Sequence, residues 1–223
     1  MTTTTPQKLR ILDAVAKLEA YHAIQNLMGR TIVALNFRQP QRVLQAFALD
    51  RDDVSFEYAD EGRFVGEEAV RALVHLLVGE PALPGEMRDH QLTTPIIEVA
   101  KDGLSARAVW WVPGAAARIG DDDEPEALWD WGAIGADIVL EGEQWLIHHL
   151  HFFRYILCHY DEGWTEDTSL INRPNIPMHP LSQPTTYHNP YSPLSVRDGI
   201  PAAPRPYDTA DGSTWMLSRD KAE

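Results

Sequence analysis

The N-terminal half of the chain changes from a helical to an extended pattern of apolar residues. Apolar side chains recur every three or four positions over residues 8–37, which predicts a helix that is either bent or divided at Gly29. Pro40 favours the start of a short second helix, and residues 66–68 favour the start of a third. Between these helices, residues 54–58 alternate apolar and polar side chains, which predicts a half-buried strand and a short returning strand after it.

The following segment predicts a meander of antiparallel strands. Extended apolar or alternating patterns predict strands at residues 90–99, 104–112, 128–140 and 144–155. Lys101-Asp102-Gly103 predicts a hairpin turn, and the acidic segment 120–126 predicts a solvated loop. Helices followed by such a run of strands predict an α+β fold, with the helices packed on one face of a curved sheet.

The pattern changes again at about residue 159. Most of the 16 prolines lie beyond this point, interleaved with aromatic residues and without a helical or strand period. We therefore predict one domain over residues 8–158 and an irregular strap over residues 159–223, which covers this domain or a neighbouring subunit. Disorder of the strap is the alternative, because proline-rich segments often do not fold.

Charge and composition exclude several classes of function. The chain has 19 Lys and Arg against 33 Asp and Glu, a net charge of −14, which disfavours binding to nucleic acid or to an anionic membrane. No apolar run is long enough to predict a membrane span or a secretory signal. The single cysteine, Cys158, excludes an internal disulfide framework. A cytoplasmic protein is therefore expected.

Several segments resemble the SnoaL-like branch of the NTF2-like superfamily. The resemblance covers about residues 8–156 and is carried by residues 22–30, 34–36, 43–47, 52–56, 62–70 and the last-strand segment GEQWLIHHLH at 142–151. It implies a cone-shaped curved sheet with an apolar pocket between the sheet and the helices. Enzymes of this superfamily, such as scytalone dehydratase, generally perform cofactor-free acid/base chemistry on ring-bearing substrates, and other members only bind ligands.

The densest group of chemically active side chains lies in the last predicted strand. Strict alternation places His149 and His151 on the same face as Ile147, so we expect both imidazoles to reach the cavity as proton-transfer groups. A metal site is an alternative that needs a third ligand, such as His90 or Tyr58. The resemblance implies no metal, so we predict neither a metal nor another cofactor. Buried structural histidines are the remaining alternative.

Two further catalytic candidates rest on position within the family pattern. Tyr58 ends the first strand and His90 begins the first long one, where scytalone dehydratase has a water-activating tyrosine and a catalytic histidine. Asn36 lies near a position where several members carry an aspartate, so we expect it to bind the ligand through hydrogen bonds instead.

Other polar and aromatic side chains are candidates for binding the substrate. Asp130 lies between two tryptophans, and its pKa is expected to be raised if it is buried. Asp137 lies an odd number of residues away and should point to the opposite face. The complete set of expected substrate-binding residues is Asn36, Phe56, Arg107, Trp111, Asp130 and Trp131.

These observations predict a cofactor-free lyase that acts on a small aromatic alcohol. The most specific expectation is conversion of a lignin-derived 1,2-diaryl-1,3-propanediol to a stilbene and formaldehyde. The alternatives are a dehydratase or isomerase of a polycyclic or polyketide-like substrate, and a non-catalytic small-molecule-binding protein. The family resemblance further implies a homo-oligomer, a dimer or trimer, formed through an outer sheet face that includes Trp110 or Phe152.

Overall fold

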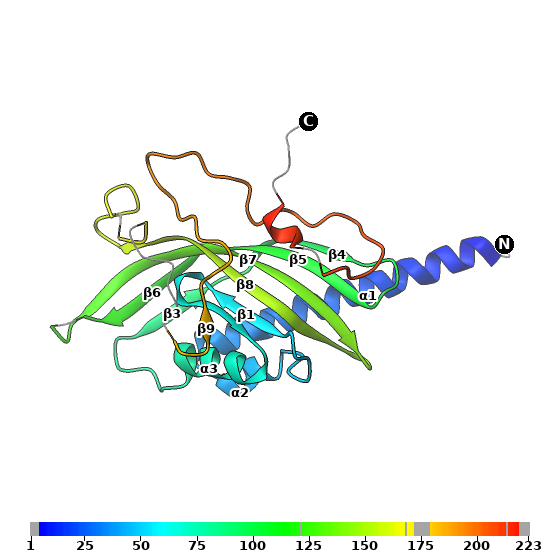
Figure 1. Ribbon diagram of the computed structural model, residues 1–223, viewed down its shortest axis with the longest axis horizontal. Helices are drawn as coiled ribbons and strands as arrows, with labels where there is room; N and C mark the ends of the chain where they lie inside the picture. Colours follow the sequence, from blue (N-terminus) through cyan, green and yellow to red (C-terminus); the bar gives the residue numbers. More distant parts are fainter. Residues whose placement is uncertain (1–4, 121, 168, 172–178, 213, 219–223) are drawn as a thin grey trace.

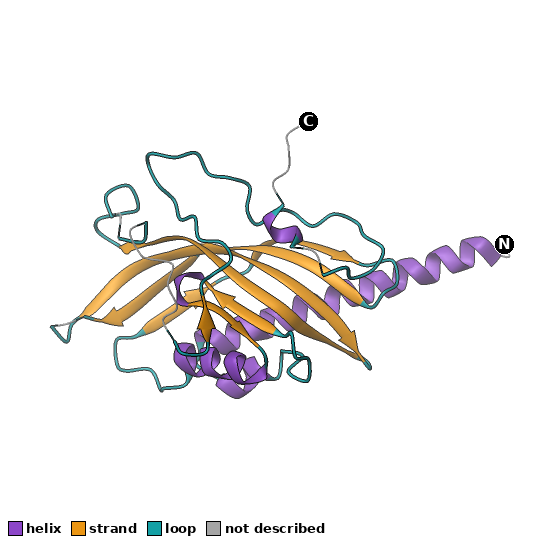
Figure 2. Cartoon of the chain, in the orientation of Figure 1, coloured by secondary structure: helices purple, strands orange, loops and turns teal. Residues whose placement is uncertain are grey.

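The computed structural model describes residues 5–120, 122–167, 169–171, 179–212 and 214–218. Three helices lie on one side of a large curved sheet, and the irregular C-terminal segment lies on the other side (Figures 1 and 2). We call the described residues from 160 onward the strap. The two sides of the sheet are the helix face and the strap face. This arrangement confirms the predicted α+β fold.

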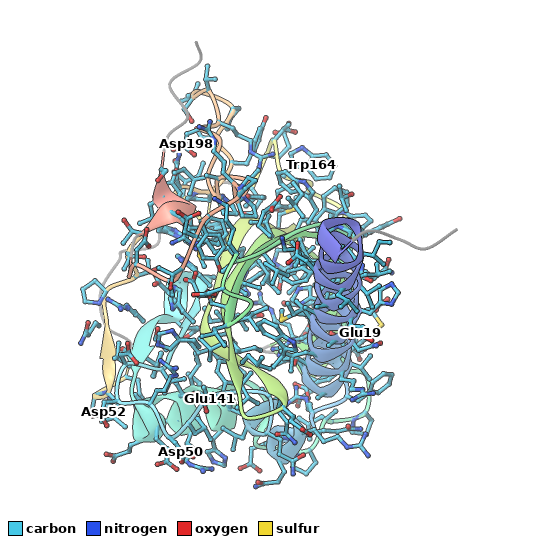
Figure 3. All side chains as sticks on the ribbon, turned by 90° about the vertical axis from the view of Figure 1, so that its right-hand side faces the viewer. Glu19, Asp50, Asp52, Glu141, Trp164 and Asp198 are labelled. Carbon is cyan, nitrogen blue, oxygen red and sulfur yellow. The ribbon has the colours of Figure 1, made fainter. Side chains whose placement is uncertain are left out.

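The helices pack an apolar stripe against the sheet. They are α1 (Thr5–Asn36), α2 (Pro40–Leu44) and α3 (Glu67–Val78). The helix α1 runs through Gly29 without interruption, because Ile24, Met28 and Ile32 are buried and their packing offsets the cost of about 1 kcal/mol for a helical glycine. The N-terminal half of α1 extends beyond the sheet, as Figure 1 shows, and the view along this helix in Figure 3 shows it beside the sheet.

The sheet is mixed, whereas a purely antiparallel sheet was predicted. Its strands are β1 (Ser55–Tyr58), β2 (Gly62–Val65), β3 (Met87–His90), β4 (Thr93–Val99), β5 (Ser105–Val112), β6 (Gly114–Ile119), β7 (Pro125–Glu141), β8 (Gln144–His159) and β9 (Ser182–Gln183). The strand order is β3-β6-β7-β8-β1-β2-β9, and β4 joins through β5, which also pairs with β7. The pair β1–β8 is parallel. Two short 3₁₀ turns, η1 (Ala59–Glu61) and η2 (Trp215–Leu217), complete the described elements.

Two strand predictions differ from the structure. The strand predicted at 90–99 is divided into β3 and β4, which pair with β6 and β5 respectively. The strand β6 was not predicted, because GAAARI carries few large apolar side chains. Both β5 and β6 pair with the long strand β7, and Pro113 lies at their junction. A proline there is compatible with the geometry, since it cannot donate a ladder hydrogen bond.

A β-bulge at His148 determines where the last strand directs its histidines. Asp137 pairs with His149 and Ile138 pairs with Ile147, so His148 is an extra residue in β8. Ile147 is buried in the core on the helix face, whereas Phe153 belongs to a second core on the strap face. The bulge thus places His149 and His151 on the strap face. The prediction that they share a face with Ile147 is wrong.

The strap contributes to the second hydrophobic core. Ile200, Trp215 and Met216 pack there against β7 and β8, and the Tyr155 hydroxyl donates a 2.9 Å hydrogen bond to the Ile200 carbonyl. Trp110 and Phe152, expected on the outer face, are instead buried in the core on the helix face. No helix in the described part of the chain is both long and apolar enough to cross a membrane.

Candidate functional site

The ten residues expected to form one site are divided between the two faces of the sheet. Asn36, Phe56, Tyr58, His90 and Asp130 gather on the helix face, between the sheet and α1. The strap face carries the other five, which are Arg107, Trp111, Trp131, His149 and His151. Asp130 and Asp137 lie on opposite faces, as their odd spacing predicts. The expectation of a single constellation is therefore wrong.

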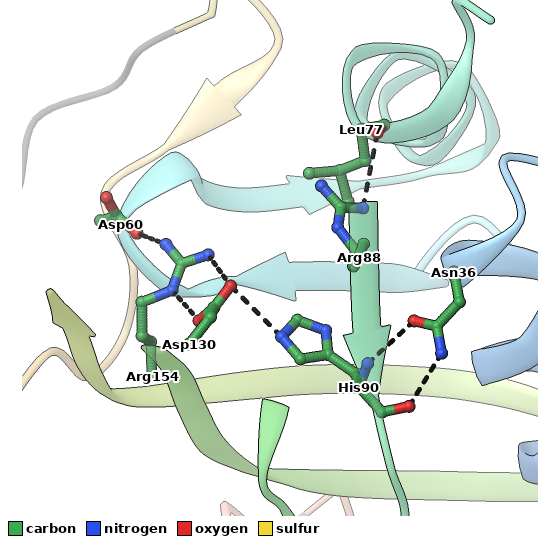
Figure 4. A network of polar contacts seen from close by, with 7 residues as sticks. All are labelled: Asn36, Asp60, Leu77, Arg88, His90, Asp130 and Arg154. Atoms are coloured by element: carbon green, nitrogen blue, oxygen red, sulfur yellow. Dashed lines mark hydrogen bonds and ion pairs between the residues drawn. The ribbon is translucent and has the colours of Figure 1, made fainter. Parts of the chain in front are cut away.

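The position of His90 is fixed by its backbone and by a glycine. Its N–H donates to Asn36 Oδ1 at 3.1 Å, and Asn36 Nδ2 donates to its carbonyl at 2.9 Å (Figure 4). The cross-strand partner of His90 is Gly114, where a Cβ would lie 2.2 Å from Cδ2 of the imidazole. Only glycine therefore allows the ring to occupy this place. Asn36 acts here by holding the end of β3 to the end of α1.

The imidazole of His90 faces a buried carboxylate that is itself held by a buried arginine. His90 Nε2 lies 3.2 Å from Asp130 Oδ2. Arg154 donates through Nε to Asp130 Oδ1 at 2.8 Å and through Nη2 to Oδ2 at 3.2 Å, and through Nη1 to Asp60 (Figure 4). All four side chains are buried. The loss of either partner would leave a buried charge uncompensated. These charged side chains therefore hold one another in a fixed arrangement.

The network sets the protonation states of its members. Burial alone opposes ionisation of Asp130, but the charges and hydrogen bonds of Arg154 and His90 outweigh it and hold its pKa well below the usual value. The expectation of a raised pKa is wrong because the sequence did not reveal Arg154 as the partner. In contrast, burial raises the pKa of Tyr58, so its hydroxyl remains protonated at neutral pH.

The low pKa of Asp130 predicts a loss of stability in acid. A carboxyl with a folded-state pKa below its unfolded value of about 3.9 stabilises the protein above that pH, and this contribution disappears as the pH falls through the folded-state value. We expect urea unfolding midpoints of the native protein to fall more steeply below about pH 4 than those of Asp130→Asn. A constant difference between the two proteins from pH 7 to pH 2 would contradict this assignment.

A small cavity brings His90 and Tyr58 together. Its volume is about 10 Å³, which is room for roughly one water molecule, and its walls include Ile32, Phe56 and Phe152. The Phe152 ring lies 5.0 Å from that of Tyr58 and 5.3 Å from the imidazole of His90. The Tyr58 hydroxyl is buried and has no hydrogen-bond partner among the described residues. A proton donor and a proton acceptor thus face one mostly apolar space, which Arg88 also lines.

Arg154 and Asp60 are parts of this site that the sequence-based prediction missed. Arg154 interrupts the apolar run Phe152-Phe153-Arg154-Tyr155-Ile156 in a long strand. A charged side chain in such a run requires a buried partner, and this is the signal that could have found it. Asp60 lies between β1 and β2, where η1 directs it toward Arg154.

The strap face holds a second polar group, built on β1 and β8. In their parallel register Glu57 is opposite His151 and Ser55 is opposite His149. His151 Nε2 lies 3.4 Å from Glu57 Oε1, and Ser55 Oγ lies 2.6 Å from His149 Nδ1. These residues line a pocket of about 270 Å³ beneath the strap. The alternating pattern of residues 54–58 predicts that Glu57 faces solvent, but the strap buries it completely.

The remaining candidates on the strap face contact the strap itself. Arg107 donates to Asp211 at 2.5 Å, and its guanidinium lies 4.2 Å from the centre of the Tyr207 ring. Trp131 packs against Trp164, with ring centres 5.9 Å apart. Trp111 is 43% exposed, and the guanidinium of Arg197 in the strap lies 5.7 Å from the centre of its ring. The contacts of Arg107 and Trp131 hold the strap in place.

Comparison with solved structures supports the fold assignment. A hexachlorocyclohexane dehydrochlorinase, LinA type 2, superimposes with a TM-score of 0.55 at 14% identity, over 70% of this chain and 99% of that one. LinA type 3 from Novosphingobium barchaimii gives 0.52 at 16%, over 66% and 93%. A candidate scytalone dehydratase from Novosphingobium aromaticivorans gives 0.53 at 16%, over 70% and 97%. At these identities the likeness establishes the fold.

A family model identifies the sequence more directly. No curated protein matches the chain. The model of the SnoaL-like domain matches residues 16–151, which is more than half of the chain and spans α1 to β8. The match includes Tyr58, His90 and Asp130 and ends at His151. The chain therefore belongs to the SnoaL-like family, whose structural neighbours include enzymes that convert small molecules.

Proposed function

We propose that this protein is a cofactor-free lyase that eliminates a leaving group from a small ring-bearing molecule in the cavity on the helix face. His90 is the general base and Tyr58 the general acid. The observation that carries this proposal is the buried imidazole of His90, backed by the Asp130–Arg154 pair and facing the same cavity as the unpartnered Tyr58 hydroxyl.

The base is prepared by its carboxylate partner. The ionised Asp130 lies 3.2 Å from Nε2 of His90 and favours the tautomer with its proton on that nitrogen, which leaves Nδ1 as the basic nitrogen. In Figure 4 this second ring nitrogen points away from Asp130. When His90 takes a proton from the substrate, the carboxylate stabilises the imidazolium that forms. Arg154 keeps Asp130 ionised, so that the carboxylate remains an acceptor.

The acid is available because burial keeps it protonated. Tyr58 has a raised pKa, so its hydroxyl carries a proton that it donates to a departing oxygen. The Arg154 guanidinium lies 5.4 Å from the centre of the Tyr58 ring, and its positive charge stabilises the phenolate that donation leaves behind. His90 and Tyr58 therefore supply the two proton transfers that an elimination with an oxygen leaving group requires.

The chemistry balances without a cofactor. The base removes a proton from carbon, the freed electron pair becomes the new double bond, and the leaving group departs with its own pair. Two structural neighbours are named as dehydrochlorinases and one as a candidate dehydratase, which supports elimination as the reaction class. In a 1,2-diaryl-1,3-propanediol, the base takes the terminal hydroxyl proton. The carbon–carbon bond then breaks, giving formaldehyde, and water leaves from the benzylic carbon to form the stilbene.

Ionisable groups in and behind the cavity favour an enzyme over a binding protein. Burying His90, Asp130 and Arg154 costs desolvation energy, and binding of an apolar ring gains nothing from them. The cavity of about 10 Å³ is filled by the protein's own aromatic side chains, so a ring-bearing substrate must displace rings such as Phe152.

A panel of three substrate classes tests the proposal. Purified full-length protein would be incubated with hexachlorocyclohexane, with a scytalone-like ketol and with a 1,2-diaryl-1,3-propanediol, each with and without a strong chelator. We expect turnover of at least one class, read as chloride release, as dehydrated product, or as stilbene with formaldehyde. We also expect the chelator to leave the rate unchanged. Tight binding of a probe without turnover of any would support a non-catalytic binding protein.

A further inference from the structure

We propose that the strap face holds a binding site for one divalent transition-metal ion of the zinc type, with Glu57, His149 and His151 as its protein ligands. One possible ligand atom from each of these residues lies within 4.8 Å of the other two. The site is on the opposite side of the sheet from His90, so it does not depend on the proposed elimination.

The register of the parallel strands β1 and β8 brings the three proposed ligands together. Glu57 on β1 lies directly opposite His151 on β8, and His149 is two residues earlier on the same face. The 3.4 Å between His151 Nε2 and Glu57 Oε1 is close to the separation of about 3.3 Å expected between two ligands of a tetrahedral zinc ion with bonds of about 2.0–2.1 Å. The ligand atom of His149 lies within 4.8 Å of the other two, so His149 must move closer to complete three-point coordination.

A buried nitrogen in this site, Nε2 of His151, lacks a hydrogen-bond partner among the described residues. His151 is 1% exposed, and its Nε2 makes no well-oriented hydrogen bond within the described part of the chain. Leaving a buried polar atom unsatisfied costs free energy, so native proteins normally pair such atoms. A metal ion would give this nitrogen the partner that it lacks.

The surrounding residues orient the ligands as outer-shell groups do in known metal sites. Ser55 Oγ bonds to His149 Nδ1 at 2.6 Å, which leaves Nε2 of that ring for a metal. Glu57 accepts hydrogen bonds from the strap, including Thr186 Oγ1 at 2.9 Å to Oε1 and 3.0 Å to Oε2, and from Thr185. The His151 ring is stacked on Phe153 with centres 3.6 Å apart, which fixes its plane.

Charge and protonation select the class of ion. Burial favours the neutral form of an imidazole, which is the form that binds metal, and His151 is 1% exposed. Two imidazoles with one carboxylate favour zinc, cobalt or iron(II) over calcium or magnesium, which prefer oxygen ligands. The positive charge of Arg63, opposite Glu57 in the β1–β2 register, disfavours weakly held cations further.

The three ligands leave coordination positions open toward the pocket of about 270 Å³. Arg63 and Arg107 line this pocket together with Asp53, Asp137 and Asp211, so a water molecule would fit as the fourth ligand. Three protein ligands with an open position are the arrangement of zinc sites that bind a water or substrate molecule.

Metal titration of the untagged full-length protein tests this proposal. After treatment with a chelator and desalting, the protein would be titrated with Zn²⁺, Co²⁺ and Mg²⁺. We expect one Zn²⁺ per chain by elemental analysis, a rise in melting temperature with Zn²⁺ and none with Mg²⁺, and visible absorption of bound Co²⁺ typical of four-coordinate geometry. Less than half an equivalent of bound Zn²⁺ at micromolar concentrations would overturn the proposal.

Variants locate the ion. His149→Gln and His151→Gln should each weaken Zn²⁺ binding by about 100-fold or more, since outer-shell changes alone cost 10- to 100-fold. His148→Gln is the matched control, because His148 is the adjacent bulge residue and its Nε2 already lies 2.9 Å from Asp53. It should bind Zn²⁺ like the native protein. Equal affinity in all three variants would show adventitious surface binding. Circular dichroism of the metal-free variants shows whether each of them is folded. Because His149 is less buried than His151, His149→Gln should disturb folding less, so its loss of Zn²⁺ binding reports the missing ligand.

Discussion

Replacing His90 with glutamine is expected to lower kcat on the best substrate of the panel by about 10²- to 10⁴-fold, with little change in KM. The imidazole takes a proton only in the transition state, and its position against Asp130 at 3.2 Å serves that step. The exposed histidine His22 on α1 provides the matched control, and His22→Gln should retain full activity. Melting temperatures of both variants check that the loss is chemical. A native rate in His90→Gln would remove this residue from the mechanism.

Tyr58→Phe gives this experiment a second, independent readout. The substitution removes only the unpartnered hydroxyl and keeps the ring that packs against Phe152. An oxygen leaving group needs a proton, whereas chloride departs without one. We therefore expect a loss of about 10²-fold or more on an alcohol substrate and a much smaller loss on a chlorinated one. Equal losses on both would assign Tyr58 to packing and not to proton transfer.

The bulge at His148 shows where sequence-based prediction of the site fails. Trp145 and Ile147 face the helix-side core, as their apolar character predicts. Strict alternation then carries His149 and His151 into the same cavity, but one inserted residue moves both histidines to the other face. No residue in the segment signals a bulge, because it depends on the pairing with β7. A catalytic set that combined both faces was therefore predicted where the structure has two separate groups.

The helix face was predicted better because its residues depend on features that the sequence displays. Tyr58 ends a short alternating strand, and His90 and Asp130 lie in recognisable extended segments, so their approximate placement followed from pattern and from family resemblance. The charged partners of these residues could not be placed in this way. Arg154 reaches Asp130 across two neighbouring strands, and Asp60 reaches Arg154 from a turn. Such contacts depend on register, which a single sequence does not fix.

The strap buries a residue that the local sequence pattern predicts to be exposed. Glu57 is the polar member of an alternating strand, which predicts solvent exposure. Thr185 and Thr186 of the strap donate to its carboxylate instead, and the side chain is fully buried. Burial by a segment so distant in the sequence cannot be predicted from the local pattern of β1. The proposed metal ligand was for this reason absent from the sequence-based candidates.

Arg154→Met is expected to produce the largest loss of stability, about 3–5 kcal/mol in the free energy of unfolding at pH 7. Methionine retains much of the volume, but Asp130 and Asp60 are left buried without their cation. The matched control is Arg71→Met, because Arg71 also makes an ion pair through its guanidinium, with Glu67 at 2.8 Å, but both side chains are about half exposed to solvent. Exposed pairs contribute little, so this control should cost about 1 kcal/mol or less from its ion pair.

The double variant Arg154→Met/Asp130→Asn separates the missing cation from lost packing. If the cost arises from an uncompensated carboxylate, neutralising Asp130 should recover part of the stability, so the two substitutions together cost less than the sum of the single ones. Urea unfolding of the four proteins at pH 7 gives this coupling energy. Strict additivity would mean that Arg154 stabilises the protein through packing alone. It would also remove the physical basis for an ionised Asp130 behind His90, and with it the basis for the proposed base.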